Sequence, residues 1–70
     1  MPDVEAHITG TVWKIEVQIG ETVQEGDTVV VLESMKLEMP VEAEDPGVVR
    51  EILVEEGQSV SEGDTLVVLE

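Results

Sequence analysis

Residues 25–33 read Glu-Gly-Asp-Thr-Val-Val-Val-Leu-Glu, and nearly the same run returns at residues 62–70 as Glu-Gly-Asp-Thr-Leu-Val-Val-Leu-Glu. Sliding the chain against itself by 37 positions places residues 1–33 on residues 38–70 and gives 17 identities in 33 pairs. All six glycines fall in pairs, at positions 10 and 47, 20 and 57, and 26 and 63. We therefore interpret residues 1–70 as one domain of two internal repeats, joined by the four residues 34–37.

The composition favours strands over helices. The chain has 14 Val, one Trp, and neither Phe nor Tyr, and β-branched side chains pack well on a pleated sheet. It has no Cys, which excludes disulfides and cysteine metal sites. No apolar run approaches the ~20 residues that span a bilayer, and the start does not resemble a signal peptide. We expect a soluble, free-standing, cytoplasmic domain.

The net charge of −14 bears on the choice of partners. Lys14, Lys36 and Arg50 are the only Lys and Arg residues, which is too few for a phosphate-binding surface. Nucleic acid and anionic membranes are therefore not expected partners. Three explanations of the acidity stay open: solubility, steering toward partners with basic docking faces, and adaptation to high salt.

Each repeat predicts three to four short strands separated by glycine turns. In the first repeat, residues 11–17 alternate so that Trp13, Ile15 and Val17 face a core, and a bulge near Gly10 would account for the parity of Val12. The other expected strands there are residues 4–6, with Pro2 at an edge-compatible start, 22–23 and 28–32, and the second repeat matches with 38–43, 48–54 and 65–69. Glu-Gly-Asp predicts a turn in each copy, because it lacks the ligand spacing of a calcium loop.

The predicted fold is all-β, a flattened barrel or sandwich of two pseudo-twofold-related halves of about four short strands each. One half alone would expose an apolar sheet face and open edges, so the halves must cover each other. The linker Ser34-Met35-Lys36-Leu37 then forms a tight hairpin turn with Lys36 at its exposed tip. Because the turn contains no Gly or Pro, we expect Lys36 to be held in a defined place.

The stretch from Glu33 to Pro40, Glu-Ser-Met-Lys-Leu-Glu-Met-Pro, resembles the biotin attachment site of the biotinyl/lipoyl carrier domain family. The family hallmark is a small residue followed by Met-Lys-Met, and here Leu37 replaces the second Met. Lipoyl domains typically place an acidic residue before the lysine, so Met35 points to biotin. The resemblance implies that a biotin–protein ligase attaches biotin covalently to Lys36, and that the biotin is then carboxylated.

The resemblance also implies roles for the neighbouring residues and for partners. Met35 and Leu37 would be apolar recognition flanks; the alternative is that they pack inward as turn anchors, and the two roles are compatible. Glu33, Ser34 and Glu38 are candidate ligase contacts. The further partners would be a biotin carboxylase and a carboxyltransferase of an acyl-CoA or pyruvate-type carboxylase, and we expect a monomer in isolation. The chain has no insertion of the kind that forms a protruding thumb in some carriers of this family.

Two alternatives stay open beside the biotin carrier. One is a lipoyl carrier, and the other is an unmodified acidic β interaction module in which Lys36 is an ordinary solvated lysine. An enzyme is not expected, because a single His cannot complete a nucleophile–base–orienter set. His7 is expected to be structural or solvated, with no metal site. Trp13 is expected to lie in the core or to be partly buried, and a partner-facing role is the alternative.

Overall fold

The computed structural model describes residues 3–70. Met1 and Pro2, and with them the edge position expected for Pro2, lie outside this range. The described residues form eight strands and no helix, so no helix within residues 3–70 is long and apolar enough to cross a membrane. The strands are β1 (Asp3–Glu5), β2 (Gly10–Ile15), β3 (Thr22–Val23), β4 (Thr28–Ser34), β5 (Leu37–Glu42), β6 (Gly47–Ile52), β7 (Ser59–Val60) and β8 (Thr65–Leu69).

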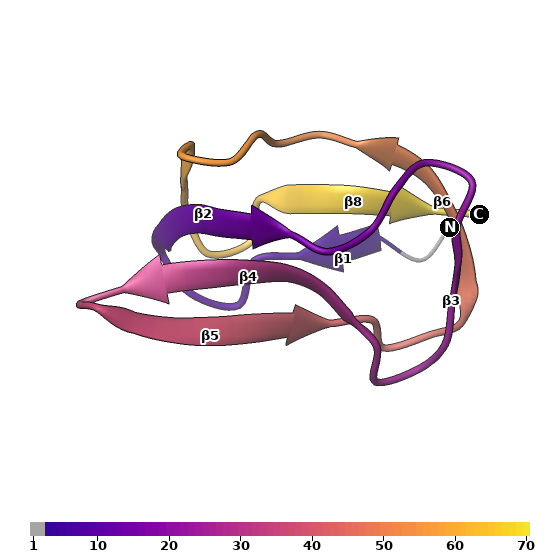
Figure 1. The fold of residues 1–70 in the computed structure, drawn as a ribbon, viewed down its shortest axis with the longest axis horizontal. Helices are drawn as coiled ribbons and strands as arrows, with labels where there is room; N and C mark the ends of the chain where they lie inside the picture. Colours follow the sequence, from indigo (N-terminus) through magenta and orange to yellow (C-terminus); the bar gives the residue numbers. More distant parts are fainter. Residues whose placement is uncertain (1–2) are drawn as a thin grey trace.

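The strands form two four-stranded sheets, in the orders β1-β8-β6-β3 and β5-β4-β2-β7 (Figure 1). Every strand pair is antiparallel. Exchanging β1 to β4 with β5 to β8 converts one sheet order into the other, which is the signature of a pseudo-twofold axis. The predicted all-β fold of two related halves is confirmed. The halves interleave, however, because each sheet takes two strands from each repeat instead of one repeat covering the other.

The core obeys the same symmetry. The buried apolar residues of the described chain form eight equivalent pairs across the repeats, and no polar side chain is buried within residues 3–70. Small β-branched side chains suit this thin core, since two closely stacked sheets leave little room for aromatic rings. The pairs are Val4 and Val41, Ala6 and Ala43, Val12 and Val49, Val17 and Val54, Val23 and Val60, Val29 and Leu66, Val30 and Val67, and Leu32 and Leu69.

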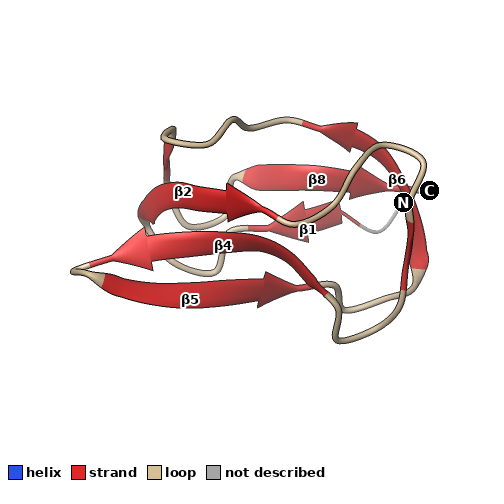
Figure 2. Ribbon diagram, viewed as in Figure 1, coloured by secondary structure: helices blue, strands red, loops and turns tan. Residues whose placement is uncertain are grey.

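The Glu-Gly-Asp segments are turns, as predicted (Figure 2). Gly26 and Gly63 have φ values of 90° and 92°, in the region that side chains rarely adopt. In each turn the Asp carboxylate accepts a hydrogen bond from a backbone N–H three residues earlier: the donor–acceptor distance is 2.8 Å both for Gln24 with Asp27 and for Ser61 with Asp64. These side chains fix the loops that precede β4 and β8.

The predicted inward face of β2 is wrong at Trp13. Val12 is buried and Trp13 is 47% exposed, because a bulge lies between Val12 and Lys14 and not near Gly10. Trp13 is the extra residue of this bulge and has no register partner on β4. After the bulge, Ile15 packs against the core and Val17 is buried, as expected. The bulge therefore reverses the alternation and turns the single aromatic side chain away from the core.

Candidate functional site: the Lys36 hairpin

The candidate site is the tip of the β4–β5 hairpin. The two strands pair in register from Thr28 with Glu42 to Ser34 with Leu37, which leaves Met35 and Lys36 as a two-residue turn. Figure 1 shows this tip extending beyond the other strands at one end of the long axis. The structure confirms the tight turn and the place of Lys36 expected from the sequence.

Both residues of the turn have left-handed backbone conformations. The φ value is 54° for Met35 and 65° for Lys36, which identifies a type I′ turn. Asn-Gly is the usual choice for this turn, because residues with a larger side chain lose roughly 1–2 kcal/mol each in the left-handed region. The strain persists because the paired strands on both sides determine the chain path. The backbone of Lys36 is therefore held by the whole sheet and not by local preference.

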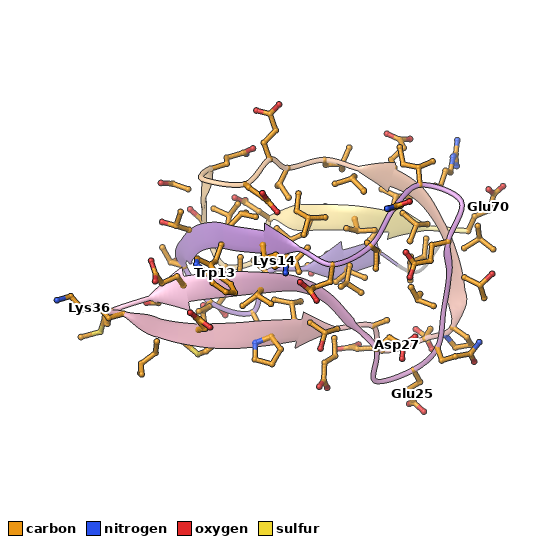
Figure 3. The ribbon with its side chains drawn as sticks, in the orientation of Figure 1. Trp13, Lys14, Glu25, Asp27, Lys36 and Glu70 are labelled. Atoms are coloured by element: carbon orange, nitrogen blue, oxygen red, sulfur yellow. The ribbon has the colours of Figure 1, made fainter. Side chains whose placement is uncertain are left out.

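The Lys36 side chain is exposed and points away from the body of the domain (Figure 3). Among residues 3–70 it has no ion-pair partner, since the ion pairs of the described chain involve Lys14 with Glu16 and Arg50 with Glu51. Glu33 and Glu38 are register partners across the base of the hairpin. Their charges make the surroundings of the amine acidic without engaging it. The amine is thus accessible to a partner enzyme.

The flanking residues are presented to solvent. Met35 is 92% exposed and Leu37 is 64% exposed, so the alternative in which both pack inward as turn anchors is wrong. Ser34 is half-buried at the end of β4, and Glu33 and Glu38 are exposed. Two apolar side chains around a charged tip offer a partner an apolar contact next to the amine. The tip therefore presents an accessible amine between two exposed apolar side chains.

A groove of about 670 Å³ lies elsewhere, between the edge strands β1 and β5, and Lys36 is not among its lining residues. His7 lines it together with six carboxylates, those of Asp3, Glu5, Glu25, Glu42, Glu44 and Glu62. Within residues 3–70, no three His, Asp or Glu side chains come close enough together to hold a metal ion. The groove is an acidic surface feature on the pseudo-twofold axis, since it is lined by equivalent residues of both repeats.

The chain matches one known family over nearly its whole length. The family model described as "Biotin-requiring enzyme", which covers biotin/lipoyl attachment domains, matches residues 1–69. The chain belongs to the biotin/lipoyl attachment family. A biotin/lipoyl attachment domain is a carrier and not a catalytic domain, and the family description bears out the predicted cofactor, biotin.

Curated members of the biotin/lipoyl attachment family match about half of the chain. A biotinylated protein TB7.3 homolog of Mycolicibacterium smegmatis is 51% identical over 39 residues, which is 56% of this chain and 55% of that protein. The biotin/lipoyl attachment protein of Bacillus subtilis is 41% identical over 38 residues, 54% of this chain and 52% of that protein. The chain thus spans about half the length of the curated relatives it matches.

Solved structures share the whole fold. A urea carboxylase of Kluyveromyces lactis superposes with a TM-score of 0.91 at 37% identity, over 97% of this chain and 6% of that one. A single-chain, multi-domain long-chain acyl-CoA carboxylase gives 0.86 at 34% identity, over 93% of this chain and 7% of that one. An aspartoacylase family protein of Mesorhizobium loti gives 0.82 at 18% identity, over 97% of this chain and 22% of that one, which is a likeness of fold alone.

One exposed residue near the hairpin is expected from the alternation of its strand to face the core or to be partly buried. Trp13 lies on β2, the strand that pairs with β4, and its side chain is on the surface (Figure 3). The signal that could have found it is the broken alternation at Val12. If Val12 faces inward, as Ile15 and Val17 do, then one extra residue must lie between Val12 and Ile15. Placing that bulge at Gly10 instead gave Trp13 the wrong face.

Proposed function

We propose that this domain is a biotin carboxyl carrier and that Lys36 is the residue that receives biotin. The observation that carries this proposal is the position of Lys36: an exposed amine, free of ion pairs among the described residues, at the tip of a hairpin whose backbone the sheet holds in place. The family match supports it, because biotin must be joined to a side chain that can reach outside the domain. Lys36 meets that requirement on the one segment that the duplication does not explain.

Attachment is an acyl transfer performed by a biotin–protein ligase. The neutral amine of Lys36 attacks the carbonyl carbon of biotinyl adenylate, an amide bond forms to Nζ, and the bond from that carbon to the phosphate oxygen of AMP breaks. Two protons leave Nζ, one when the ammonium group becomes the neutral amine and one as the amide forms, and they pass to a base of the ligase and to solvent, since no side chain of residues 3–70 engages Lys36. Met35 and Leu37 give the ligase apolar contacts, and Glu33, Ser34 and Glu38 lie within its footprint.

The attached biotin carries a carboxyl group from a biotin carboxylase to a carboxyltransferase. The domain positions and tethers the cofactor, and the tether raises its effective concentration at both enzyme sites. Similarity to a urea carboxylase and to an acyl-CoA carboxylase supports a place in a biotin-dependent carboxylase. The acceptor is then an acyl-CoA or another small carboxylase substrate.

The residue before the lysine favours biotin over lipoate. Met35 is fully exposed beside the amine, where a lipoyl-type domain would present a carboxylate. The name of the Bacillus subtilis relative covers both cofactors, so the choice is tested directly. The protein is incubated with ATP and either biotin and a biotin ligase or lipoate and a lipoate ligase, and its intact mass is measured.

The position of the adduct is read by digestion after glutamate. Cleavage after Glu33 and Glu38 releases Ser34-Met35-Lys36-Leu37-Glu38, which contains a single lysine. We expect one biotin on this peptide and none on the Lys36→Arg variant, whose circular dichroism and unfolding should match the wild type. Biotin retained by that variant would refute the site. A lipoyl adduct alone would assign a lipoyl carrier, and no adduct from either ligase would indicate an unmodified β module.

A further inference from the structure

The exposed Trp13 has no function in attachment, and the duplication shows that its position is special. Trp13 and Arg50 are equivalent residues of the two repeats, and both are the extra residue of a bulge: one between Val12 and Lys14, the other between Val49 and Glu51. The two bulges thus occupy equivalent positions in the register and carry different side chains. The aromatic one is on β2, which pairs with β4, the strand that leads into the Lys36 hairpin.

Trp13 is also within reach of a group carried by Lys36. Val12 and Lys14, on either side of Trp13, pair with Leu32 and Val31 of β4, so Trp13 lies beside this part of β4. Lys36 is four residues beyond Leu32, two of them in β4 and two in the turn, so it is at most about 13 Å away along the strand direction, and the neighbouring strand adds about 5 Å sideways. Biotin on Lys36 hangs from about eleven single bonds between the Cα atom and its ring, an extended length of roughly 14 Å. In Figure 3, Trp13 lies in the half of the domain that is nearer to Lys36.

We propose that Trp13 is a surface docking site for the ring of the biotin attached to Lys36. This inference rests on the proposed function. Trp13 is 47% exposed, and its indole offers a flat apolar surface to the thioether-containing ring of biotin, since sulfur and aliphatic groups pack favourably against aromatic rings. The polar ureido edge of the ring stays in water. Tethering makes a weak contact effective, because the ring is held near the indole at millimolar effective concentration.

The chain offers a direct optical test. Trp13 is the single Trp and there is no Tyr, so intrinsic fluorescence reports on this side chain alone. Emission and acrylamide quenching are measured for the unmodified protein and for the biotinylated protein, whose loading is verified by mass. We expect attachment to shift the emission to shorter wavelength and to lower the quenching constant about two-fold, because one face of the indole becomes covered.

Two controls separate tethered docking from other effects. Free biotin added to the Lys36→Arg variant at the same concentration should leave the emission unchanged, since the contact is weak without the tether. The swap Trp13→Arg with Arg50→Trp moves the indole to the equivalent bulge of the other sheet, where attachment at Lys36 should have no effect. Nuclear Overhauser contacts between biotin ring protons and indole protons in the wild type supply a measurement that needs no variant.

Identical emission and quenching before and after attachment, with no Overhauser contact, would overturn the proposal. So would an equal response of the swapped variant. Failure of the ligase to modify Lys36 is a separate result, seen by mass. In that case the 70-residue chain is prepared by chemical synthesis with biotinyl-lysine at position 36, and the same optical comparison decides whether Trp13 docks the ring.

Discussion

A Cβ atom on Gly10 would lie 2.6 Å from the carbonyl oxygen of Glu33, so β2 and β4 meet at the base of the Lys36 hairpin without room for a side chain. The equivalent residue, Gly47, is less crowded: its Cβ would lie 3.1 Å from the carbonyl oxygen of Glu70 and 3.2 Å from Cβ of Leu69. The duplication thus supplies a matched pair of glycines with different tolerance for a methyl group.

We predict that Gly10→Ala destabilises the domain by about 1–3 kcal/mol, the usual cost of forcing extra volume into a packed site. Gly47→Ala should cost less, because a shift of a few tenths of an ångström relieves its contacts. Urea unfolding of both variants measures the difference as a change in midpoint at constant slope. Equal costs would show that the close approach at Gly10 is not a packing constraint.

Because the turn has a left-handed backbone, residues that favour this conformation should stabilise the domain, although replacing Lys36 removes the candidate site. Replacing Met35 and Lys36 by Asn and Gly installs the preferred type I′ pair and should raise the free energy of unfolding by about 1 kcal/mol, since the relief of strain exceeds the entropy that Gly adds to the unfolded chain. Met35→Asn alone retains the lysine and should give part of the gain. No gain in denaturant midpoint for either variant would mean that the turn is unstrained.

The side chains beside the lysine should govern which ligase acts. Met35→Asp with Leu37→Ala removes both exposed apolar flanks. We expect the rate of biotin attachment to fall about ten-fold, equivalent to about 1.4 kcal/mol of transition-state binding, and lipoate attachment to rise. Leu37→Met is the control and should keep the biotinylation rate. An unchanged biotinylation rate in the double variant would show that the ligase reads the fold and not the flanks.

The turn carboxylates should contribute to stability individually. Asp27→Ala removes the acceptor for the backbone N–H of Gln24, and Asp64→Ala removes the equivalent acceptor for Ser61. Each should lower the free energy of unfolding by about 1 kcal/mol, while Asn at either position retains an oxygen acceptor and should cost less. Thermal unfolding of the four variants gives the comparison. Asn variants as unstable as the Ala variants would indicate that the charge matters more than the hydrogen bond.

The net charge of −14 predicts an unusual response to salt. Added sodium chloride screens repulsion among the carboxylates, so the melting temperature should rise between about 0.01 and 1 M salt. Salt also screens attractive ion pairs, but this should cost little stability, because the ion pairs of the described residues are exposed. They are Lys14 with Glu16 at 3.6 Å and Arg50 with Glu51 at 4.0 Å. A melting temperature that falls over this range would show that attractive pairs outweigh the repulsion.

The fold was readable from the sequence because the duplication repeats every structural signal. Each buried position recurs 37 residues later, and the Glu-Gly-Asp turns mark the same corner twice. The unique segment 34–37 then had to be the connection between halves. The same duplication predicts that Lys36 lies at the exposed end of that connection, where the structure has it.

Other features depend on strand pairing and register, which the pattern of one amino-acid sequence does not show. The interleaving of the repeats is set by long-range pairing, such as β3 with β6 and β2 with β7, which leaves no local mark. Trp13 was misplaced because one extra residue reverses the alternation of a strand, and its location within the strand is a register property. The left-handed turn was hidden as well, because neither Met35 nor Lys36 is a residue that favours positive φ.

β1 pairs with β8, so strands from the two ends of the described chain lie side by side. The β4–β5 hairpin is available once residue 42 has left the ribosome, but the sheet order around it is completed only by β7, and the opposite sheet only by β8. A ligase that requires the rigid tip will therefore act only on chains in which β7 and β8 have already joined their sheets. Biotin attached at Lys36, as proposed above, would then report that both sheets of this domain have assembled.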